Sequence, residues 1–123
     1  MKLKHSGLVT EDVQRLTRFY ERITGAKAAI LNRGYVEFQH SPCAGLAITA
    51  TSPTRAYGES VLAPSRNRSL VLDFEVENVD SHYARLKDSV SDWVLPPTDM
   101  PWGNRSMLFR DPDGNLINFF SQP

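Results

Sequence analysis

The chain has 123 residues, a length that favours one domain with a substantial buried core. Its 14 basic and 14 acidic residues balance, so no overall electric field favours nucleic acid or a membrane surface as a partner. No apolar run approaches a signal-peptide core or a membrane span. The single cysteine, Cys43, excludes an intrachain disulfide and suits the reducing cytoplasm, where we expect the protein to act.

The first half of the chain predicts one helix among four strands. Hydrophobic alternation predicts a strand over 3–10, and apolar side chains at helical spacing predict a helix over 11–24. We expect Thr10 to cap the helix and Gly25 to end it. The apolar positions at helical spacing are Val13, Leu16, Tyr20 and Ile23. The other predicted strands are 28–31, 35–39 and 46–51, the last two joined by a turn-rich stretch over 40–45.

The same order of elements then repeats after a change in composition. Residues 52–68 hold polar and helix-breaking residues with no sustained period, which predicts a linker. The second-half elements are a strand over 70–76, a helix over 79–89 capped by Asn78 or Asp80, a strand over 93–95 and a final hairpin. We therefore expect a single domain over 1–123, with module 1 at about 1–52, a linker at about 53–68 and module 2 at about 69–123.

The final hairpin is the most specific motif. Its strands, Ser106 to Arg110 and Leu116 to Phe120, flank the turn Asp-Pro-Asp-Gly-Asn, in which Pro sets φ and Gly can take φ > 0. With the preceding Pro101-Trp102-Gly103 and Arg105, this hairpin resembles the last hairpin of the vicinal oxygen chelate superfamily. That superfamily holds glyoxalase I, bleomycin-resistance proteins and extradiol dioxygenases, and the resemblance covers essentially the whole chain.

The resemblance implies a fold, and strand alternation then separates two faces. The implied fold is α+β, with two βαβββ modules in one domain that form a curved mixed sheet with a concave ligand cleft. A homodimer is also implied, since relatives commonly pair. The residues expected to pack on the helices are Leu8, Leu46, Ile48, Leu70, Leu72, Phe74, Val76, Ile117 and Phe119. Those expected on the cleft face are His5, Gly7, Val9, Ala47, Thr49, Val71, Asp73, Glu75, Leu116, Asn118 and Phe120.

The metal site of the superfamily is not matched by this sequence. Metal-dependent members place four ligands, usually His, Glu or Gln, on the inward faces, and the resemblance maps these positions onto His5, Thr49, Val71 and Asn118. Only His5 is a good ligand for a divalent transition metal, since Thr and Asn offer weak neutral oxygens and Val offers none. We therefore expect no cofactor, with a divalent metal as the alternative. His40 lies in a predicted turn and His82 is expected to be solvated, so neither supplies a missing metal ligand.

His5 and Asp73 each keep several interpretations. His5 either hydrogen-bonds an organic ligand, or is a partly buried structural histidine, or is one ligand of a metal completed by Asp73 or by a partner chain. The plainer interpretation of Asp73 is an ion pair with a nearby Arg. At most one of Tyr35 and Phe38 lines the cleft, because they point to opposite faces of their strand. Tyr57, in the linker, either folds over the cleft or is solvated.

Trp102 and Arg105 are candidate ligand contacts outside the sheet faces. Trp102 either stacks on a planar or cationic ligand or packs in its loop. Arg105 either offers a fork to a carboxylate or phosphate or forms an intramolecular ion pair. No serine elbow, phosphate loop or dinucleotide motif is present, and Cys43 has no basic neighbour, so no catalytic residue is assigned.

Three functions follow from these observations. The first is a metal-free protein that binds a small organic ligand, resembling the bleomycin-resistance branch, although a net charge of zero argues against capture of a cationic drug. The second is a metal-dependent lyase, isomerase or dioxygenase with an irregular site built from His5 and Asp73. The third is a regulatory module whose cleft is filled by a partner. The residues expected to bind the ligand are His5, Thr49, Val71, Asp73, Trp102, Arg105 and Asn118.

Overall fold

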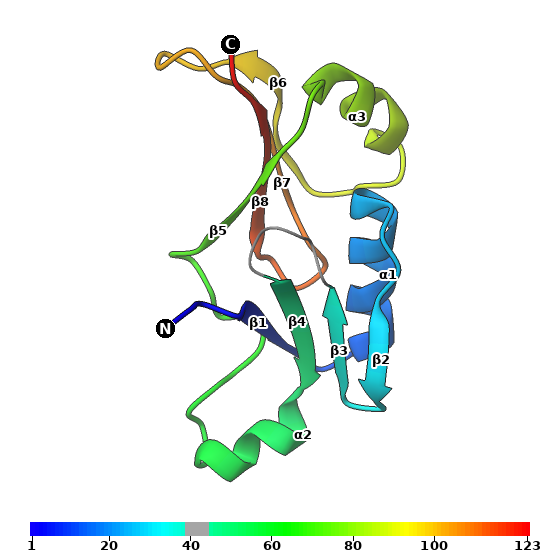
Figure 1. The fold of residues 1–123 in the computed structure, drawn as a ribbon, viewed down its shortest axis with the longest axis vertical. Helices are drawn as coiled ribbons and strands as arrows, with labels where there is room; N and C mark the ends of the chain where they lie inside the picture. The colour runs from blue at the N-terminus through cyan, green and yellow to red at the C-terminus, as the bar shows by residue number, and fades with distance from the viewer. Residues whose placement is uncertain (39–44) are drawn as a thin grey trace. The chain divides into compact units, whose positions relative to one another are not determined.

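The computed structural model describes residues 1–38 and 45–123. The chain forms two compact units, Met1–Arg66 and Asn67–Pro123, and the boundary falls at the end of the stretch expected to link two modules. Each unit contains a four-stranded mixed sheet in a βαβββ pattern (Figure 1). This is the α+β pattern that the sequence predicts. No described helix is long and apolar enough to cross a membrane.

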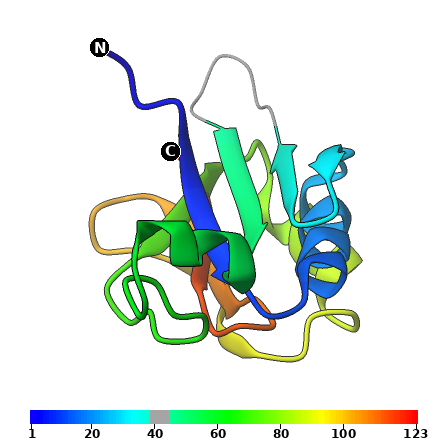
Figure 2. The same ribbon diagram turned by 90° about the horizontal axis from the view of Figure 1, so that it is seen from below.

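The first unit has the sheet order β1-β4-β3-β2, with β1 and β4 parallel and the other pairs antiparallel. Its elements are β1 (His5–Thr10), α1 (Val13–Thr24), β2 (Ala29–Asn32), β3 (Tyr35–Phe38) and β4 (Gly45–Ala50). Figure 2 shows these strands side by side, with α1 next to β2 and β3. The predicted turn over 40–45, with His40 and Cys43, lies outside the described residues except for Gly45.

Helix α1 begins two residues later than the sequence predicts. Its N-cap is Asp12, whose carboxylate accepts the backbone N–H of Arg15 at 3.0 Å. The expectation that Thr10 caps the helix is therefore wrong. The Thr10 hydroxyl instead accepts the N–H of Asp12 at 3.2 Å, because the chain needs two residues to turn out of β1. The helix ends at Gly25, whose φ of 73° is the left-handed conformation that glycine adopts without strain.

The core of the first unit lies between α1 and one face of its sheet. Leu16, Tyr20 and Ile23 of α1 are at most 1% exposed, and they share this burial with Phe38 and Ile48 of the sheet. Each such side chain contributes roughly 1.5–3 kcal/mol by leaving water. The three helix residues are those expected from the helical spacing.

The segment after β4 contains regular structure that the sequence does not predict. It forms a short helix, α2 (Thr51–Thr54), and a 3₁₀ turn, η1 (Arg55–Tyr57). The Thr54 hydroxyl donates to the carbonyl of Thr51 at 2.6 Å, and the Thr51 hydroxyl donates to the carbonyl of Thr10 at 3.2 Å. Such local hydroxyl bonds stabilise a turn without any hydrophobic period, so pattern analysis misses it.

The second unit has the sheet order β5-β8-β7-β6, again with its first and last strands in sequence parallel. Its elements are β5 (Val71–Glu75), α3 (Val79–Leu86), β6 (Trp93–Asp99), β7 (Arg105–Arg110) and β8 (Leu116–Ser121). The Asn78 side chain caps α3 by accepting the N–H of Ser81. The buried residues of this unit include Val79, Leu86, Val90, Met107, Phe109, Ile117 and Phe119.

Several boundaries in the second unit differ from the prediction. Helix α3 ends at Leu86 and not at 89. Strand β6 continues through Pro96 and Pro97, which is possible because it is an edge strand with register shifts. Leu70, expected to pack on the helix, precedes β5 and is 42% exposed.

The turn between β7 and β8 uses the mechanism that the sequence predicts. The buried Asp111 carboxylate accepts the backbone N–H groups of Asp113 and Asn115, both at 2.9 Å, and the Asn115 amide at 2.8 Å. Gly114 has a φ of 88°. One carboxylate thus satisfies three donors and fixes the hairpin.

Candidate functional site

The sheet face opposite α1 is hollowed in the first unit. Gly7 of β1 lies beside Ala47 of β4 in the register, and nothing lies within 4 Å of a Cβ built on Gly7. A cavity of about 230 Å³ occupies this place. It is lined by His5, Gly7, Val9, Tyr35, Ala47, Thr49, Pro53, Thr54, Tyr57 and Leu62. Two small residues side by side create the space, and strand alternation supplies its walls.

Three polar side chains form a chain of hydrogen bonds on this face. The Tyr35 hydroxyl donates to Oε1 of Glu37 at 3.0 Å and lies 3.3 Å from Nε2 of His5. Since the hydroxyl has one proton, Nε2 of His5 holds the proton in its own bond and donates to the Tyr35 oxygen. In the neutral imidazole, the remaining nitrogen, Nδ1, then carries a lone pair. It is buried and has no hydrogen-bond partner among the described residues.

The environment of Tyr35 favours the neutral phenol. Burial raises the pKa of Tyr35 above its ordinary value of 10.0, and the hydrogen bond to Glu37 and the negative charge of Glu37 raise it further. The phenol therefore stays protonated at neutral pH and holds the His5 ring in one orientation. Sequence reasoning missed Glu37, although its spacing of two residues from Tyr35 places both on one face of β3.

Thr49 and Tyr57 also line the cavity, but the Thr49 hydroxyl is already bonded and Tyr57 is largely exposed. The Thr49 hydroxyl donates to the carbonyl of Gly34 at 3.1 Å, so its proton is already used. Tyr57 lines the cavity while remaining 74% exposed. The cavity is therefore bounded on one side by the segment that follows β4, which the sequence predicts to be a linker.

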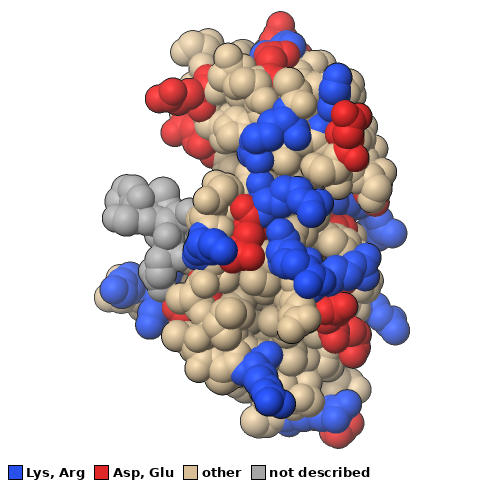
Figure 3. Space-filling model, turned by 90° about the vertical axis from the view of Figure 1, so that its right-hand side faces the viewer, with Lys and Arg blue, Asp and Glu red and all other residues tan. Residues whose placement is uncertain are grey.

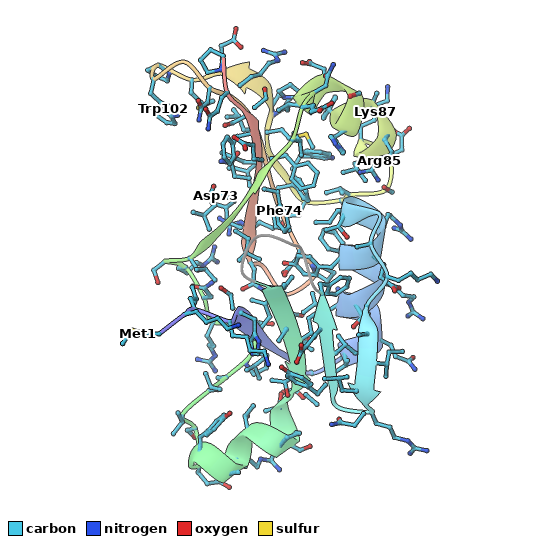
Figure 4. The ribbon with its side chains drawn as sticks, in the orientation of Figure 1. Met1, Asp73, Phe74, Arg85, Lys87 and Trp102 are labelled. Carbon is cyan, nitrogen blue, oxygen red and sulfur yellow. The ribbon has the colours of Figure 1, made fainter. Side chains whose placement is uncertain are left out.

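In the second unit, the predicted residues Asp73 and Asn118 lie together. They are register partners on β5 and β8, and the Asn118 amide donates to Oδ1 of Asp73 at 2.9 Å. Figure 4 shows Asp73 and Phe74 leaving β5 on opposite sides, as strand alternation requires. The Asn118 carbonyl oxygen is buried and has no partner among the described residues. Val71 is 40% exposed and offers no polar atom.

Trp102 and Arg105 lie at and beside the loop between β6 and β7. Trp102 is 72% exposed at the tip of this loop (Figure 4). Arg105 forms ion pairs with Asp80, at 2.7 and 2.9 Å, and with Asp99, at 2.9 Å. These pairs raise the pKa of Arg105, and they lower that of Asp80. Three guanidinium N–H groups are thus used within the unit, which is the intramolecular ion pair given above as one alternative for Arg105.

His82 is less solvated than expected. Its ring is half-buried and meets Phe119 edge to face, with the ring centroids 5.3 Å apart. Burial lowers the pKa of His82, and the nearby Arg85 lowers it further. His82 is therefore a packing residue of the second unit.

A sequence profile of the Glyoxalase/Bleomycin resistance protein/Dioxygenase superfamily matches residues 2–119. The chain belongs to this superfamily. Among curated protein sequences, none matches the chain significantly.

Several solved structures share the fold. A glyoxalase/bleomycin resistance protein/dioxygenase from Nocardioides is 23% identical, covers 99% of this chain and 83% of its own, and gives a TM-score of 0.81. A family enzyme from Burkholderia phytofirmans PsJN is 13% identical, with 100% of both chains covered and a TM-score of 0.89. TioX from Micromonospora sp. ML1 is 21% identical over 100% of both chains, with a TM-score of 0.73. At these identities the likeness concerns the fold.

The metal ligands of the superfamily do not fit the residues of this member. The Thr49 hydroxyl is bonded to a backbone carbonyl, the Asn118 amide is bonded to Asp73, and Val71 has no donor atom. Among residues 1–38 and 45–123, no three His, Cys, Asp or Glu side chains gather closely enough to hold a metal ion. A divalent transition metal needs three or four such ligands at one point. His5 remains the one ligand of that type among the four mapped positions.

Proposed function

We propose that the protein binds a small organic ligand in the cavity of its first unit, without a resident divalent metal. The observation that carries this proposal is the His5 imidazole in the cavity wall, held by Tyr35 and Glu37, with one nitrogen unpartnered. A buried polar atom without a partner costs roughly 1–3 kcal/mol. Buried polar groups with a purely structural role are normally hydrogen-bonded, so an unpartnered nitrogen in a cavity wall supports a role in binding a ligand.

The lining of the cavity indicates the kind of ligand. Val9, Pro53 and Leu62 supply an apolar wall, and the Tyr57 ring supplies an aromatic one. The volume of about 230 Å³ is below the ~300–1,000 Å³ of whole ligand pockets, so the cavity holds one ring or a short acyl group of the ligand. A polar N–H or O–H on that group would pair with the His5 imidazole.

The alternative of a metal-dependent lyase, isomerase or dioxygenase has weaker support. It needs Asp73 as a ligand together with His5, and the Asp73 carboxylate already accepts the Asn118 amide. Elemental mass spectrometry of protein purified without chelator or affinity tag tests it directly. We expect less than about a tenth of an equivalent of Ni, Zn, Fe or Mn, and no thermal stabilisation on adding metal. Near-stoichiometric metal that disappears in His5→Ala would overturn the proposal.

The binding proposal is tested by filling the cavity. A library of small aromatic and short acyl amides and alcohols is screened for compounds that raise the unfolding temperature. Gly7→Leu places a side chain in the open space, so we expect it to abolish stabilisation by every hit while the protein still folds. Ala84→Leu, at an exposed position of α3, is the matched control and should keep the hits. Hits that stabilise Gly7→Leu equally would place the binding elsewhere.

The partners and location extend the same proposal. The protein would act in the cytoplasm as a homodimer, with a small ligand and without nucleic acid or membrane contacts. The balanced charge and the single cysteine support the location and the absence of polyanionic partners. Light scattering coupled to size-exclusion chromatography distinguishes a dimer from a monomer of 13.9 kDa.

A further inference from the structure

A second, larger hollow lies in the first unit on the other side of the sheet. It is a crevice of about 770 Å³ between α1 and the β2–β3 hairpin. Figures 1 and 2 both show α1 running beside these two strands. The crevice shares no lining residue with the His5 cavity, so whatever it binds is independent of the proposed function.

The crevice exists because α1 does not cover the edge strand. Ile30 of β2 is the register partner of Val36 of β3, and both face the helix side of the sheet. Val36 is 3% exposed, whereas Ile30 is 74% exposed. The cover that α1 gives the sheet therefore ends between β3 and β2. An apolar floor at Val36 and an apolar wall at Ile30 remain open to a molecule from solution.

Cationic and hydroxyl groups from separate elements converge on this crevice. Arg18 comes from α1 and Arg33 from the turn between β2 and β3, and neither forms an ion pair with any described residue. Figure 3, which views the side of the molecule that carries α1, shows Lys and Arg atoms on this side with Asp and Glu atoms among them. The Thr17 side chain is only 8% exposed, and its hydroxyl has no partner among residues 1–38 and 45–123. A buried donor without an acceptor marks a place where an acceptor from outside would bind.

One acidic group, Glu21, also lines the crevice, and it lowers the net positive charge that the lining presents to a ligand. Glu21 directs Oε2 to the backbone N–H of Ala28 at 3.0 Å. Together with Arg18 of α1 and Arg33 of the β2–β3 turn, Glu21 gives the lining two positive charges and one negative charge. The excess of one positive charge is complementary to a monoanion. The apolar floor disfavours a bare hydrated ion, since covering Ile30 and Val36 requires an apolar body.

We propose that this crevice binds a small organic carboxylate with an apolar body. The carboxylate accepts N–H groups from Arg18 and Arg33, whose planar forks suit two oxygens, and it accepts the hydroxyl proton of Thr17. The apolar body covers Ile30 and Val36. The volume lies within the ~300–1,000 Å³ of small-molecule sites, which is ample for a chain of about eight carbons.

The test uses octanoate as the probe and octanol as its neutral counterpart. Binding is followed by amide chemical shifts of the isotope-labelled full chain, with inorganic phosphate as a second control. We expect octanoate to shift the resonances of α1 and the β2–β3 hairpin, and to bind at least about tenfold more tightly than octanol or phosphate.

Two variants test the charge contribution, and two others serve as controls. Arg18→Gln and Arg33→Gln should each weaken octanoate binding about fivefold to tenfold. Arg15→Gln changes an exposed arginine on the same helix that does not line the crevice, so it should leave the affinity unchanged. His5→Gln should leave it unchanged as well, which separates this site from the cavity on the other face.

Four outcomes would overturn the proposal. These are equal binding of octanol, equal losses in Arg15→Gln and Arg18→Gln, octanoate shifts centred on β1 and β4, and no saturable shift up to about 10 mM octanoate. Thr17→Val gives an independent check, because it removes the hydroxyl while leaving both guanidinium groups. It should weaken octanoate binding while the protein remains folded.

Discussion

The first unit joins His5, Tyr35 and Glu37 in one chain of hydrogen bonds on the sheet face opposite its helix, and the second unit pairs Asp73 with Asn118 on its β5–β8 pair. Both faces belong to the same βαβββ topology, with a parallel pair of strands and two antiparallel neighbours. In the first unit an imidazole nitrogen has no partner among the described residues, and in the second a carboxylate accepts an amide whose own oxygen has none there either. One topology therefore supports two kinds of polar surface.

The difference arises from a single pair of positions in each parallel strand pair. Gly7 lies beside Ala47 in the first unit, and Asp73 lies beside Asn118 in the second. Two side chains with at most one carbon leave open space above the first sheet, while at the matching positions of the second sheet a carboxylate and an amide bond to each other. The proposed ligand site of the first unit depends on this space, because a pocket requires volume as well as polar groups.

The largest expected effect is a loss of stability in the second unit, at the hairpin between β7 and β8. Asp111→Ala removes three hydrogen bonds to a buried carboxylate and leaves two backbone N–H groups without it. We expect the free energy of unfolding to fall by about 3 kcal/mol, measured by urea denaturation. Asp88→Ala, at an exposed position of the same unit, should change it by less than about 0.5 kcal/mol. A loss below about 1 kcal/mol in Asp111→Ala would mean that water replaces the carboxylate in the turn.

A smaller effect concerns the hydrogen-bonded chain of the first unit. Tyr35→Phe removes the hydroxyl that joins His5 to Glu37, and we expect a loss of about 1 kcal/mol at neutral pH. The raised pKa of Tyr35 means that the folded state favours the neutral phenol. Its stabilisation is present below pH 10.0 and is lost as the pH rises through the raised pKa. The stability of Tyr35→Phe should therefore decline less steeply between about pH 9 and 11 than that of the unmodified protein.

The control for this prediction is a tyrosine in the other unit. Tyr83 packs edge to face on Trp93, with the ring centroids 5.0 Å apart, and lies outside the hydrogen-bonded chain of the first unit. Tyr83→Phe should keep the alkaline decline of the unmodified protein. If both variants gave the same slope, the alkaline loss of stability would come from groups other than Tyr35.

A third effect, in the first unit, is a gain in stability, in contrast to the loss expected for Tyr35→Phe. Thr17 buries a hydroxyl that has no partner among the described residues, and Thr17→Val replaces it with a methyl group. We expect the free energy of unfolding to rise by about 1 kcal/mol in the absence of ligand. Thr24→Val is the matched control, since the Thr24 hydroxyl donates to the carbonyl of Tyr20 at 2.6 Å and accepts the N–H of Ala26. It should lower stability, so equal effects in the two variants would contradict the assignment.

The smallest expected effect is the acid response of His82 in the second unit. Its pKa is lowered, so the folded state favours the neutral ring, and the stabilisation present above pH 6.5 is lost as the pH falls through the lowered pKa. His82→Phe keeps the contact with Phe119 and removes the titration. Its stability should fall less between about pH 7 and 5 than that of the unmodified protein. Since the ring is half-buried, the difference is small, and an unchanged slope would show that solvent screens it.

The order of the elements could be predicted because each has a local signal. Apolar side chains at helical spacing identified α1, and the Asp-Pro-Asp-Gly-Asn turn identified the last hairpin. The predicted boundaries were less accurate where side-chain hydrogen bonds to the nearby backbone determine where an element begins. Asp12 caps α1 in place of Thr10, and threonine hydroxyls organise α2 within the expected linker. Such bonds depend on backbone geometry that no periodicity reveals.

The candidate site was predicted in part. Alternation placed His5, Gly7 and Thr49 on one face of the first sheet, and the cavity is lined by all three. Glu37 was missed, because its role depends on the reach of the Tyr35 ring, and for Tyr57 the sequence left open whether it lines the cleft or is solvated. The ligand roles of Trp102 and Arg105 stay predictions, with Arg105 already paired to Asp80 and Asp99.

The sequence by itself determined the superfamily, the repeated βαβββ order and the poor metal ligands at three of four positions. These depend on residue identity and local period, which the chain carries without folding. Only the tertiary structure decided which polar groups meet. It joined His5 to Tyr35 across β1, β4 and β3, and it left Ile30 uncovered beside α1. Contacts between strands that are distant in sequence, and the extent to which a helix covers a sheet, follow from packing of the whole unit.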